Sequence, residues 1–131
     1  MFTLWFERRH KVLMAQVSGV LSSDDLDTHD RAVLRFLAGL TGVRAIYDFS
    51  AVDALAVPAS KIAQRGQQPA MISERRVVVA PRQAGEEFAL IIRDQQRAAG
   101  LPEPTIVATL EEAYALLGLD YQASFEPVDL S

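Results

Sequence analysis

The chain has 131 residues, half of which are hydrophobic (50%), and a formal charge of −4, so residues 1–131 are expected to form a single domain with its own core. The absence of cysteine excludes disulfides, cysteine-ligated metal centres and a thiol nucleophile. The negative charge argues against a nucleic-acid-binding surface, and no apolar run suits a membrane span or a signal peptide, so we expect a cytoplasmic protein.

Two strand-like runs begin the chain. Residues 3–7 are rich in aromatic side chains, residues 12–20 contain several β-branched ones, and a polar turn lies between the two runs, which predicts an antiparallel hairpin. Trp5 and Phe6 are neighbours on the first strand and therefore point to opposite faces of the sheet. Both are buried only if both faces are covered. An open face would leave one aromatic ring for a second copy or an apolar ligand to cover.

The first helix is expected to begin at Ser22, because a serine followed by aspartates can cap free backbone N–H groups and complement the helix dipole. Apolar residues then recur at helical spacing from Leu26 to Leu40, and glycines end the helix. His29 lies on this apolar stripe and is interpreted as a packed, hydrogen-bonded histidine. The aspartates between residues 24 and 30 spread around the helix and are interpreted as favourable charge at its start, without a metal.

Three strand–helix repeats follow. Strands are predicted at residues 43–47, 76–80 and 105–108, and helices are predicted to begin near Pro58, to run through Phe88 and to begin at Thr109. Thr109 and Glu112 have the spacing of a reciprocal capping box. This order predicts an α/β fold: a mixed, mostly parallel sheet that begins with an antiparallel hairpin and is covered by helices. The tail, residues 121–131, has mixed polarity and receives no predicted element.

A site is expected where the parallel strands end, because ligands and partners usually meet such sheets at the carboxyl ends of the strands. Asp48 is expected to follow its strand directly, and residues 48–60 are predicted to be the longest loop of the chain. No nucleophile elbow and no phosphate-binding loop is present. The candidate partner-binding residues at this edge are Asp48, Ser50, Asp53, Pro58, Ser60 and Arg82.

The same segment carries a family resemblance. Residues 45–53, Ala-Ile-Tyr-Asp-Phe-Ser-Ala-Val-Asp, followed by Val-Pro-Ala-Ser at 57–60, resemble the centre of a STAS-type domain of the small bacterial branch related to anti-sigma-factor antagonists. Residues 76–80 and 109–113 also fit the last strands and helix of such domains, so the resemblance covers nearly the whole chain in element order.

The resemblance implies a STAS-like fold and a regulatory module on which partner proteins dock beyond the central strand. It also implies phosphorylation of a serine or threonine at the start of the next helix. Ser60 is the nearest hydroxyl and is the candidate phosphoacceptor. The chain departs from the family's Asp-Ser-Ser/Thr-Gly-Leu motif, because residues 54–58 read Ala-Leu-Ala-Val-Pro.

Three functions follow from these observations. The leading hypothesis is a non-enzymatic, STAS-like interaction module whose residues 48–60 are covered by a partner or by a second copy in a homodimer. The alternative is a binder of a small apolar ligand or lipid, held between helices and sheet. An enzyme ranks last, because it would rest only on Asp48 and Arg82 lying at one edge. No cofactor, metal or membrane insertion is expected. The cavity of the alternative would be lined by residues such as Phe36, Phe49, Ile62 and Phe88.

Overall fold

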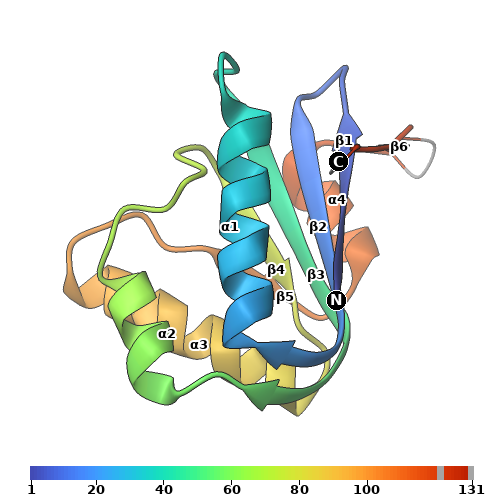
Figure 1. Ribbon diagram of the computed structural model, residues 1–131. Helices are drawn as coiled ribbons and strands as arrows, with labels where there is room; N and C mark the ends of the chain where they lie inside the picture. Colours follow the sequence, from blue (N-terminus) through green and yellow to red (C-terminus); the bar gives the residue numbers. More distant parts are fainter. Residues whose placement is uncertain (121–122, 130–131) are drawn as a thin grey trace.

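The structure is a computed structural model that describes residues 1–120 and 123–129. Within these residues, six strands form one sheet in the order β5-β4-β3-β2-β1-β6, and four helices pack against it (Figure 1). The elements along the chain are β1 (Phe2–Glu7), β2 (Val12–Ser22), α1 (Ser23–Leu37), β3 (Arg44–Ala56), α2 (Ala59–Gly66), β4 (Arg76–Val79), α3 (Gln83–Ala98), β5 (Thr105–Val107), α4 (Leu110–Leu117) and β6 (Glu126–Pro127).

The predicted fold class is confirmed. Strands β2, β3, β4 and β5 run parallel to one another, while β1 pairs with β2 in the expected antiparallel hairpin. The tail, for which the sequence predicted no element, adds β6 antiparallel to β1 at the edge of the sheet, with Trp5 opposite Pro127. Residues 121–122 and 130–131 of that tail lie outside the described residues.

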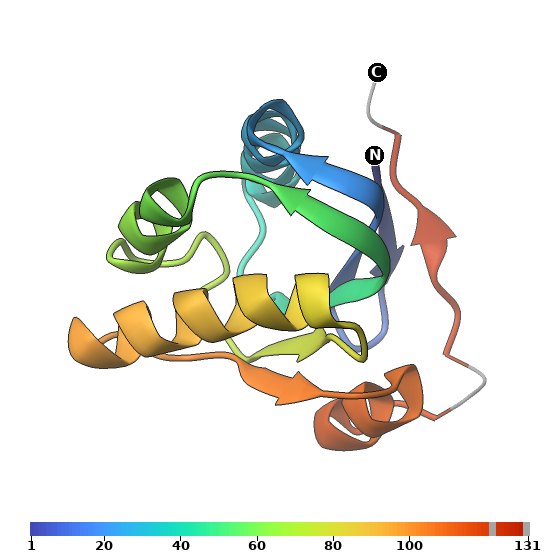
Figure 2. The ribbon, with the colours of Figure 1, turned by 90° about the horizontal axis from the view of Figure 1, so that it is seen from below.

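The helices cover the two faces of the sheet unequally. Figure 2 shows α1, α2 and α3 on one side and α4 on the other. Alternation along β2 explains this division, because Leu13 and Ala15 face the core beneath α1 while Val12 and Met14 face the core beneath α4. Short β-branched strands such as β4, which is buried along its whole length, suit a sheet covered in this way.

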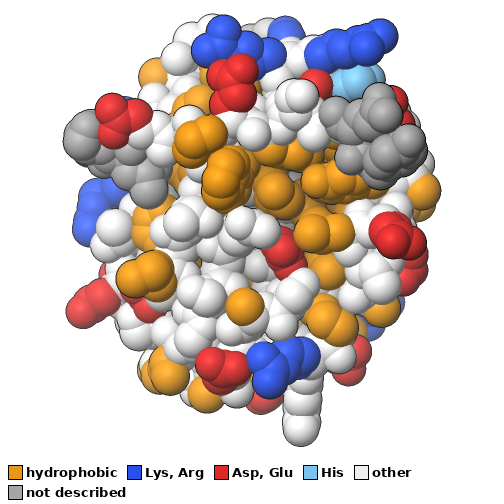
Figure 3. All heavy atoms as spheres, turned by 90° about the vertical axis from the view of Figure 1, so that its right-hand side faces the viewer, with side chains coloured by type: hydrophobic (Ala, Val, Ile, Leu, Met, Phe, Trp, Pro, Cys, Tyr) orange, Lys and Arg blue, Asp and Glu red, His pale blue; other side chains and the backbone are white. Residues whose placement is uncertain are grey.

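Trp5 and Phe6 of β1 are both partly covered, one on each face of the sheet. Phe6 contacts Phe36 of α1 edge-to-face, with ring centroids 5.0 Å apart. Trp5 packs on the opposite face against the core beneath α4, together with Phe125 of the tail, whose ring stacks on Tyr114 at 5.8 Å. Hydrophobic side chains gather on this face between charged ones (Figure 3). Phe125 of the tail, for which the sequence predicted no element, therefore helps to cover the face of the sheet on which Trp5 lies.

Helix starts follow the predicted capping chemistry in part. At α1 the Ser22 hydroxyl accepts from the Asp25 backbone N–H at 3.1 Å, and the Asp25 carboxylate accepts from the Ser22 N–H at 3.4 Å. At α4 the Thr109 hydroxyl accepts from the Glu112 N–H at 3.1 Å, but the Glu112 carboxylate accepts from the Thr109 hydroxyl. The reciprocal box therefore forms at Ser22, and Thr109 makes only one half of the predicted box.

Residues 48–60 do not form the predicted loop, because β3 continues to Ala56. Its pairing with β4 ends at Asp48, opposite Val79, but its pairing with the long strand β2 continues as far as Ser22 opposite Ala56. Two register shifts interrupt this second half, and they let the ribbon of β2 and β3 twist beyond the rest of the sheet. Asp48 thus lies level with the end of β4 but inside its own strand.

The second helix begins one residue later than predicted. Pro58 is its N-cap residue and lies outside its first turn, and the proline carbonyl accepts from the N–H groups of Lys61 and Ile62 at 3.0 and 3.2 Å. The fixed φ of proline suits this junction between strand and helix, where no N–H is needed. Among the described residues, no helix has the length and apolar character needed to cross a membrane.

Candidate functional site

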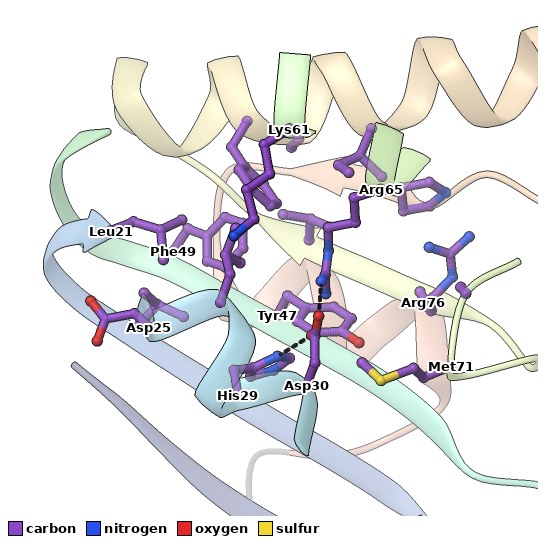
Figure 4. A pocket seen from close by; sticks show the side chains of 18 of the residues that line it. Leu21, Asp25, His29, Asp30, Tyr47, Phe49, Lys61, Arg65, Met71 and Arg76 are labelled. Carbon is purple, nitrogen blue, oxygen red and sulfur yellow. Dashed lines mark hydrogen bonds and ion pairs between the residues drawn. The ribbon is translucent and has the colours of Figure 1, made fainter. Parts of the chain in front are cut away.

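A pocket of about 350 Å³ lies between α1, α2 and the sheet. Figure 4 shows side chains from both helices and from the strands pointing into it. Across its mouth, Lys61 of α2 pairs with Asp27 of α1 at 3.2 Å, and Arg65 of α2 pairs with Asp30 of α1. The floor is apolar and is formed by side chains of the strands and of α3, namely Val17, Phe49 and Val78 from the sheet and Phe88, Ala89 and Ile92 from α3.

His29 supplies a buried polar atom to this pocket. Its side chain belongs to α1, is only 5% exposed, and packs edge-to-face on Phe2 with ring centroids 5.4 Å apart. Nδ1 lies 3.1 Å from Asp30 Oδ1, so the carboxylate makes Nδ1 the protonated nitrogen of the neutral ring. Nε2 is buried and has no hydrogen-bond partner among the described residues. Such an unpaired atom is costly, which points to a ligand or water at this position.

Asp30 holds this arrangement through two contacts, with His29 and Arg65 (Figure 4). Burial acts to raise the pKa of the Asp30 carboxyl, but the hydrogen bonds with His29 and Arg65 and the Arg65 charge hold it below its usual value. The carboxylate is therefore ionised at neutral pH, and it orients the imidazole.

Arg76 and Tyr47 also belong to the polar part of the lining, together with the amide side chains of Gln64, Gln68 and Gln96. Arg76 is the first residue of β4 and lies on the same face as Val78. Its Nη2 donates to Gln96 Oε1 at 3.1 Å and to the Pro102 carbonyl at 2.6 Å. Burial raises the pKa of the Tyr47 hydroxyl, against the opposing charges of Arg65 and Arg76, so this hydroxyl stays a donor at neutral pH.

Asp48 lies away from this pocket, on the face toward α4. It is 7% exposed, accepts from Gln16 Nε2 at 3.1 Å and from the Ser50 N–H at 3.0 Å, and also accepts from the Ser50 hydroxyl. These bonds lie at the first register shift between β2 and β3, where the Asp48 side chain accepts a hydrogen bond from the backbone N–H of Ser50. Burial and, to a smaller extent, Asp48 raise the pKa of Tyr114 in α4. Asp48 is therefore a buried structural carboxylate inside a strand, and its predicted place in an exposed loop is wrong.

Asp53, Pro58, Ser60 and Arg82, the other predicted site residues farther along the chain, lie on the surface, with Asp53 inside β3 and Arg82 at the start of α3. Asp53 and Arg82 are both exposed and form an ion pair at 2.9 Å. Arg82 donates to Asp53, whereas Asp48 lies inside β3 with Gln16 and Ser50 as its partners. Pro58 and the candidate phosphoacceptor Ser60 are exposed at the start of α2.

The expected cavity residues were half right. Phe49 and Phe88 line the pocket, whereas Ile62 is buried in the core and Phe36 packs against Phe6. The sequence did not single out Asp30, Arg65 or Arg76. A usable signal existed for Arg76, because a charged residue two positions before Val78 in a fully buried strand must share its face.

The aspartates of α1 point in different directions and have separate partners, two of them on α2. Asp25 caps the helix, Asp27 pairs with Lys61, and Asp30 pairs with Arg65. In the described part of the chain, no group of three or more histidine, cysteine, aspartate or glutamate side chains is placed to hold a metal ion.

Comparisons with protein-family models, with curated proteins and with solved structures find no match to this chain. The STAS-like assignment therefore remains a hypothesis based on element order and on residues 45–60, and the function is argued below from the site.

Proposed function

We propose that this protein is a non-enzymatic, cytoplasmic binder of a small amphipathic molecule, held in the pocket between α1, α2 and the sheet. The observation that carries the proposal is His29 Nε2, which is buried without a partner among the described residues, in a pocket with an apolar floor. A volume of about 350 Å³ falls within the range of small-ligand pockets, which combine apolar walls with a few polar groups.

The chemistry of the lining supports binding over covalent catalysis. The described residues that line the pocket include no serine, threonine or cysteine for His29 to activate. The polar groups instead suit recognition, because His29 offers an acceptor and Tyr47 offers a donor. Both lie above side chains that bury an apolar ligand body.

Titration with the fluorescent apolar anion 1-anilinonaphthalene-8-sulfonate, alongside native mass spectrometry of the purified full chain, tests this proposal. We expect saturable binding of one probe per chain, and loss of that binding when Val78→Phe fills the floor. Val79→Ala is the matched control: Val79 is the next residue of β4 but faces α4, so its truncation destabilises the fold without entering the pocket. Unchanged probe binding in Val78→Phe would contradict the proposal.

A second candidate function is the interaction module, in which a second copy covers the surface around Asp53, Ser60 and Arg82. The ribbon of β2 and β3 favours it, because beyond Asp48 one edge of β3 has no strand partner in the described residues. Val20 on this ribbon is 53% exposed. Exposed edges and apolar side chains are common sites of strand addition.

Light scattering after gel filtration tests this second function. We expect a dimer that Val20→Glu converts to a monomer, whereas Leu34→Glu, at a similarly exposed position on α1, leaves the dimer intact. A wild-type chain that stays monomeric at high concentration would rule out self-association through this surface.

A further inference from the structure

We propose that the ligand of this pocket is an apolar carboxylate whose negative head group pairs with Arg76. This assignment rests on the proposed function, because it gives the chemical class of the ligand for the same pocket.

Arg76 is a buried cation with no counter-charge among the residues that the structure describes. The residue is only 8% exposed. Its two hydrogen bonds within the described residues run to neutral acceptors, Gln96 Oε1 and the Pro102 carbonyl. No ion pair joins it to a carboxylate of the described residues, and burial and the positive charge of Arg65 both lower its pKa, with Tyr47 acting in the opposite direction. A guanidinium stays protonated in proteins, so this positive charge is present and uncompensated.

Every other charge around the pocket has its own partner. Asp27 is matched by Lys61 at 3.2 Å and Asp30 by Arg65. Asp25, at the rim, is matched by the amino group of Met1 at 3.5 Å. Among the described charged residues that line the pocket, Arg76 is thus left without an ion-pair partner. Burying an unpaired charge is unfavourable, and a ligand anion is the group that would remove this cost.

The guanidinium also has donors left to offer. Both of its hydrogen bonds within the described residues come from Nη2, while a guanidinium carries five N–H groups in a planar fork that fits a carboxylate. A single unpaired positive charge matches the one negative charge of a carboxylate better than the nearly two of a phosphate monoester.

The floor indicates where the rest of the ligand lies. Val78 is two residues beyond Arg76 on the same face of β4, and Phe49 and Phe88 continue the apolar surface from there. Their rings meet edge-to-face at 5.5 Å. A molecule with its carboxylate at Arg76 would therefore lay an apolar body along these side chains, away from the paired charges at the mouth.

Three probes with one apolar body and different heads test the assignment: decanoate, decanol and decylamine, measured by calorimetry on the full chain at neutral pH. We expect decanoate to bind about tenfold more tightly than decanol, which is the usual contribution of a charge-assisted hydrogen bond, and decylamine to bind most weakly. Equal binding of decanoate and decanol would overturn the carboxylate assignment and leave the proposed function standing. Failure of all three probes to bind would count against both, and the anilinonaphthalene titration would then decide on the pocket itself.

Substitutions assign the preference to one residue. Arg76→Gln should reduce decanoate binding about tenfold, to the level of decanol, and leave decanol binding unchanged. Arg75→Gln is the matched control, because Arg75 is the preceding residue, loses the same charge and is exposed outside the pocket. An equal loss of decanoate binding in both variants would show a general effect of charge and overturn the pairing with Arg76.

Arg76 also joins β4 to α3 through its hydrogen bond with Gln96, so its substitution could disturb the fold itself. A measurement on the wild-type protein avoids this problem. Carbon-13 NMR of carboxyl-labelled decanoate bound to the wild-type protein provides it. Pairing with Arg76 predicts a carboxyl pKa below that of free decanoate, whereas burial without a cation predicts a pKa above it. A raised pKa would overturn the proposal even if Arg76→Gln does not fold.

Discussion

Nδ1 of His29 lies 3.1 Å from Oδ1 of Asp30, the next residue of α1, and this contact determines which ring nitrogen is left inside the pocket. The carboxylate accepts from Nδ1, so in the uncharged form of the ring the lone pair lies on the buried Nε2. The fold thus holds an acceptor that has no partner in the described residues. The first two predictions concern the effect of this acceptor on stability and the role of Asp30 in holding the ring.

Replacing His29 by leucine should separate stability from binding. The substitution removes the hydrogen bond with Asp30, but it also removes a buried nitrogen that has no partner in the described residues, so we expect the free energy of unfolding to change by no more than about 1 kcal/mol. Probe binding should nevertheless fall. Urea denaturation and the anilinonaphthalene titration measure the two effects. A loss of more than about 2 kcal/mol would show that a water or another group satisfies Nε2 in solution.

Asp30→Asn should remove a pH-dependent contribution to stability. The folded-state pKa of Asp30 is lowered, so its contribution is fully present above the unfolded-state pKa of about 3.9 and is lost as the pH falls through the folded-state value. We expect the variant to be less stable than the wild type by about 1 to 3 kcal/mol at pH 7, and by progressively less below pH 4. Urea denaturation at several pH values checks this. A difference that stays constant down to pH 2 would contradict it.

Gly85→Ala should destabilise the protein, although alanine favours helices. A Cβ at this position would lie 2.8 Å from Phe49 Cβ and 3.3 Å from the Phe49 carbonyl, so α3 or β3 must shift. We expect a loss of about 1 to 3 kcal/mol from this overpacking, against a gain of at most 1 kcal/mol from helix propensity. Glu86→Ala, at the exposed next position, is the control for changes at the helix start. Thermal unfolding of both variants decides, and an unchanged Gly85→Ala protein would refute the close approach.

Phe125→Ala should loosen the tail from the sheet. The Phe125 ring stacks on Tyr114, and the adjacent β6 covers Trp5. We expect a loss of about 1 to 2 kcal/mol, because the ring is only partly buried, together with a red shift of tryptophan emission. The chain has a single tryptophan, so the spectrum reports on Trp5 alone. Ser124→Ala should change neither quantity. Emission that stays the same in Phe125→Ala would show that the tail does not shield Trp5.

Local patterns were enough to predict most of the elements. The alternation of strands and helices gave the order and the largely parallel sheet, and Ser22 gave the start of α1 through its capping box. Val77 and its neighbours formed an unbroken apolar run, which is what a strand covered on both faces requires. These features depend on neighbours in the sequence and can therefore be inferred from it.

The site was less predictable, because it depends on partners distant in the sequence. The apolar run at residues 43–47 predicts that the strand ends before Asp48, yet Gln16 and Ser50 donate to the Asp48 carboxylate within the sheet and β3 continues. His29 was correctly expected to be packed and hydrogen-bonded, but nothing in its own segment showed that Nε2 would lack a partner. The sequence could suggest a pocket between helices and sheet but could not establish one. The depth of such a pocket depends on the distance between α1 and α2, which no local pattern determines.

The division of the core by the sheet has a dynamic consequence. Val77 and Val79 are held from the α4 side, whereas the floor beneath α1 and α2 belongs to the other layer. A ligand could then enter through a local opening of α1 or α2, while the ladder of hydrogen bonds between β3 and β4 stays intact. We therefore expect amide exchange to be slow in that ladder at all times, and to slow in α1 and α2 only when the pocket is occupied.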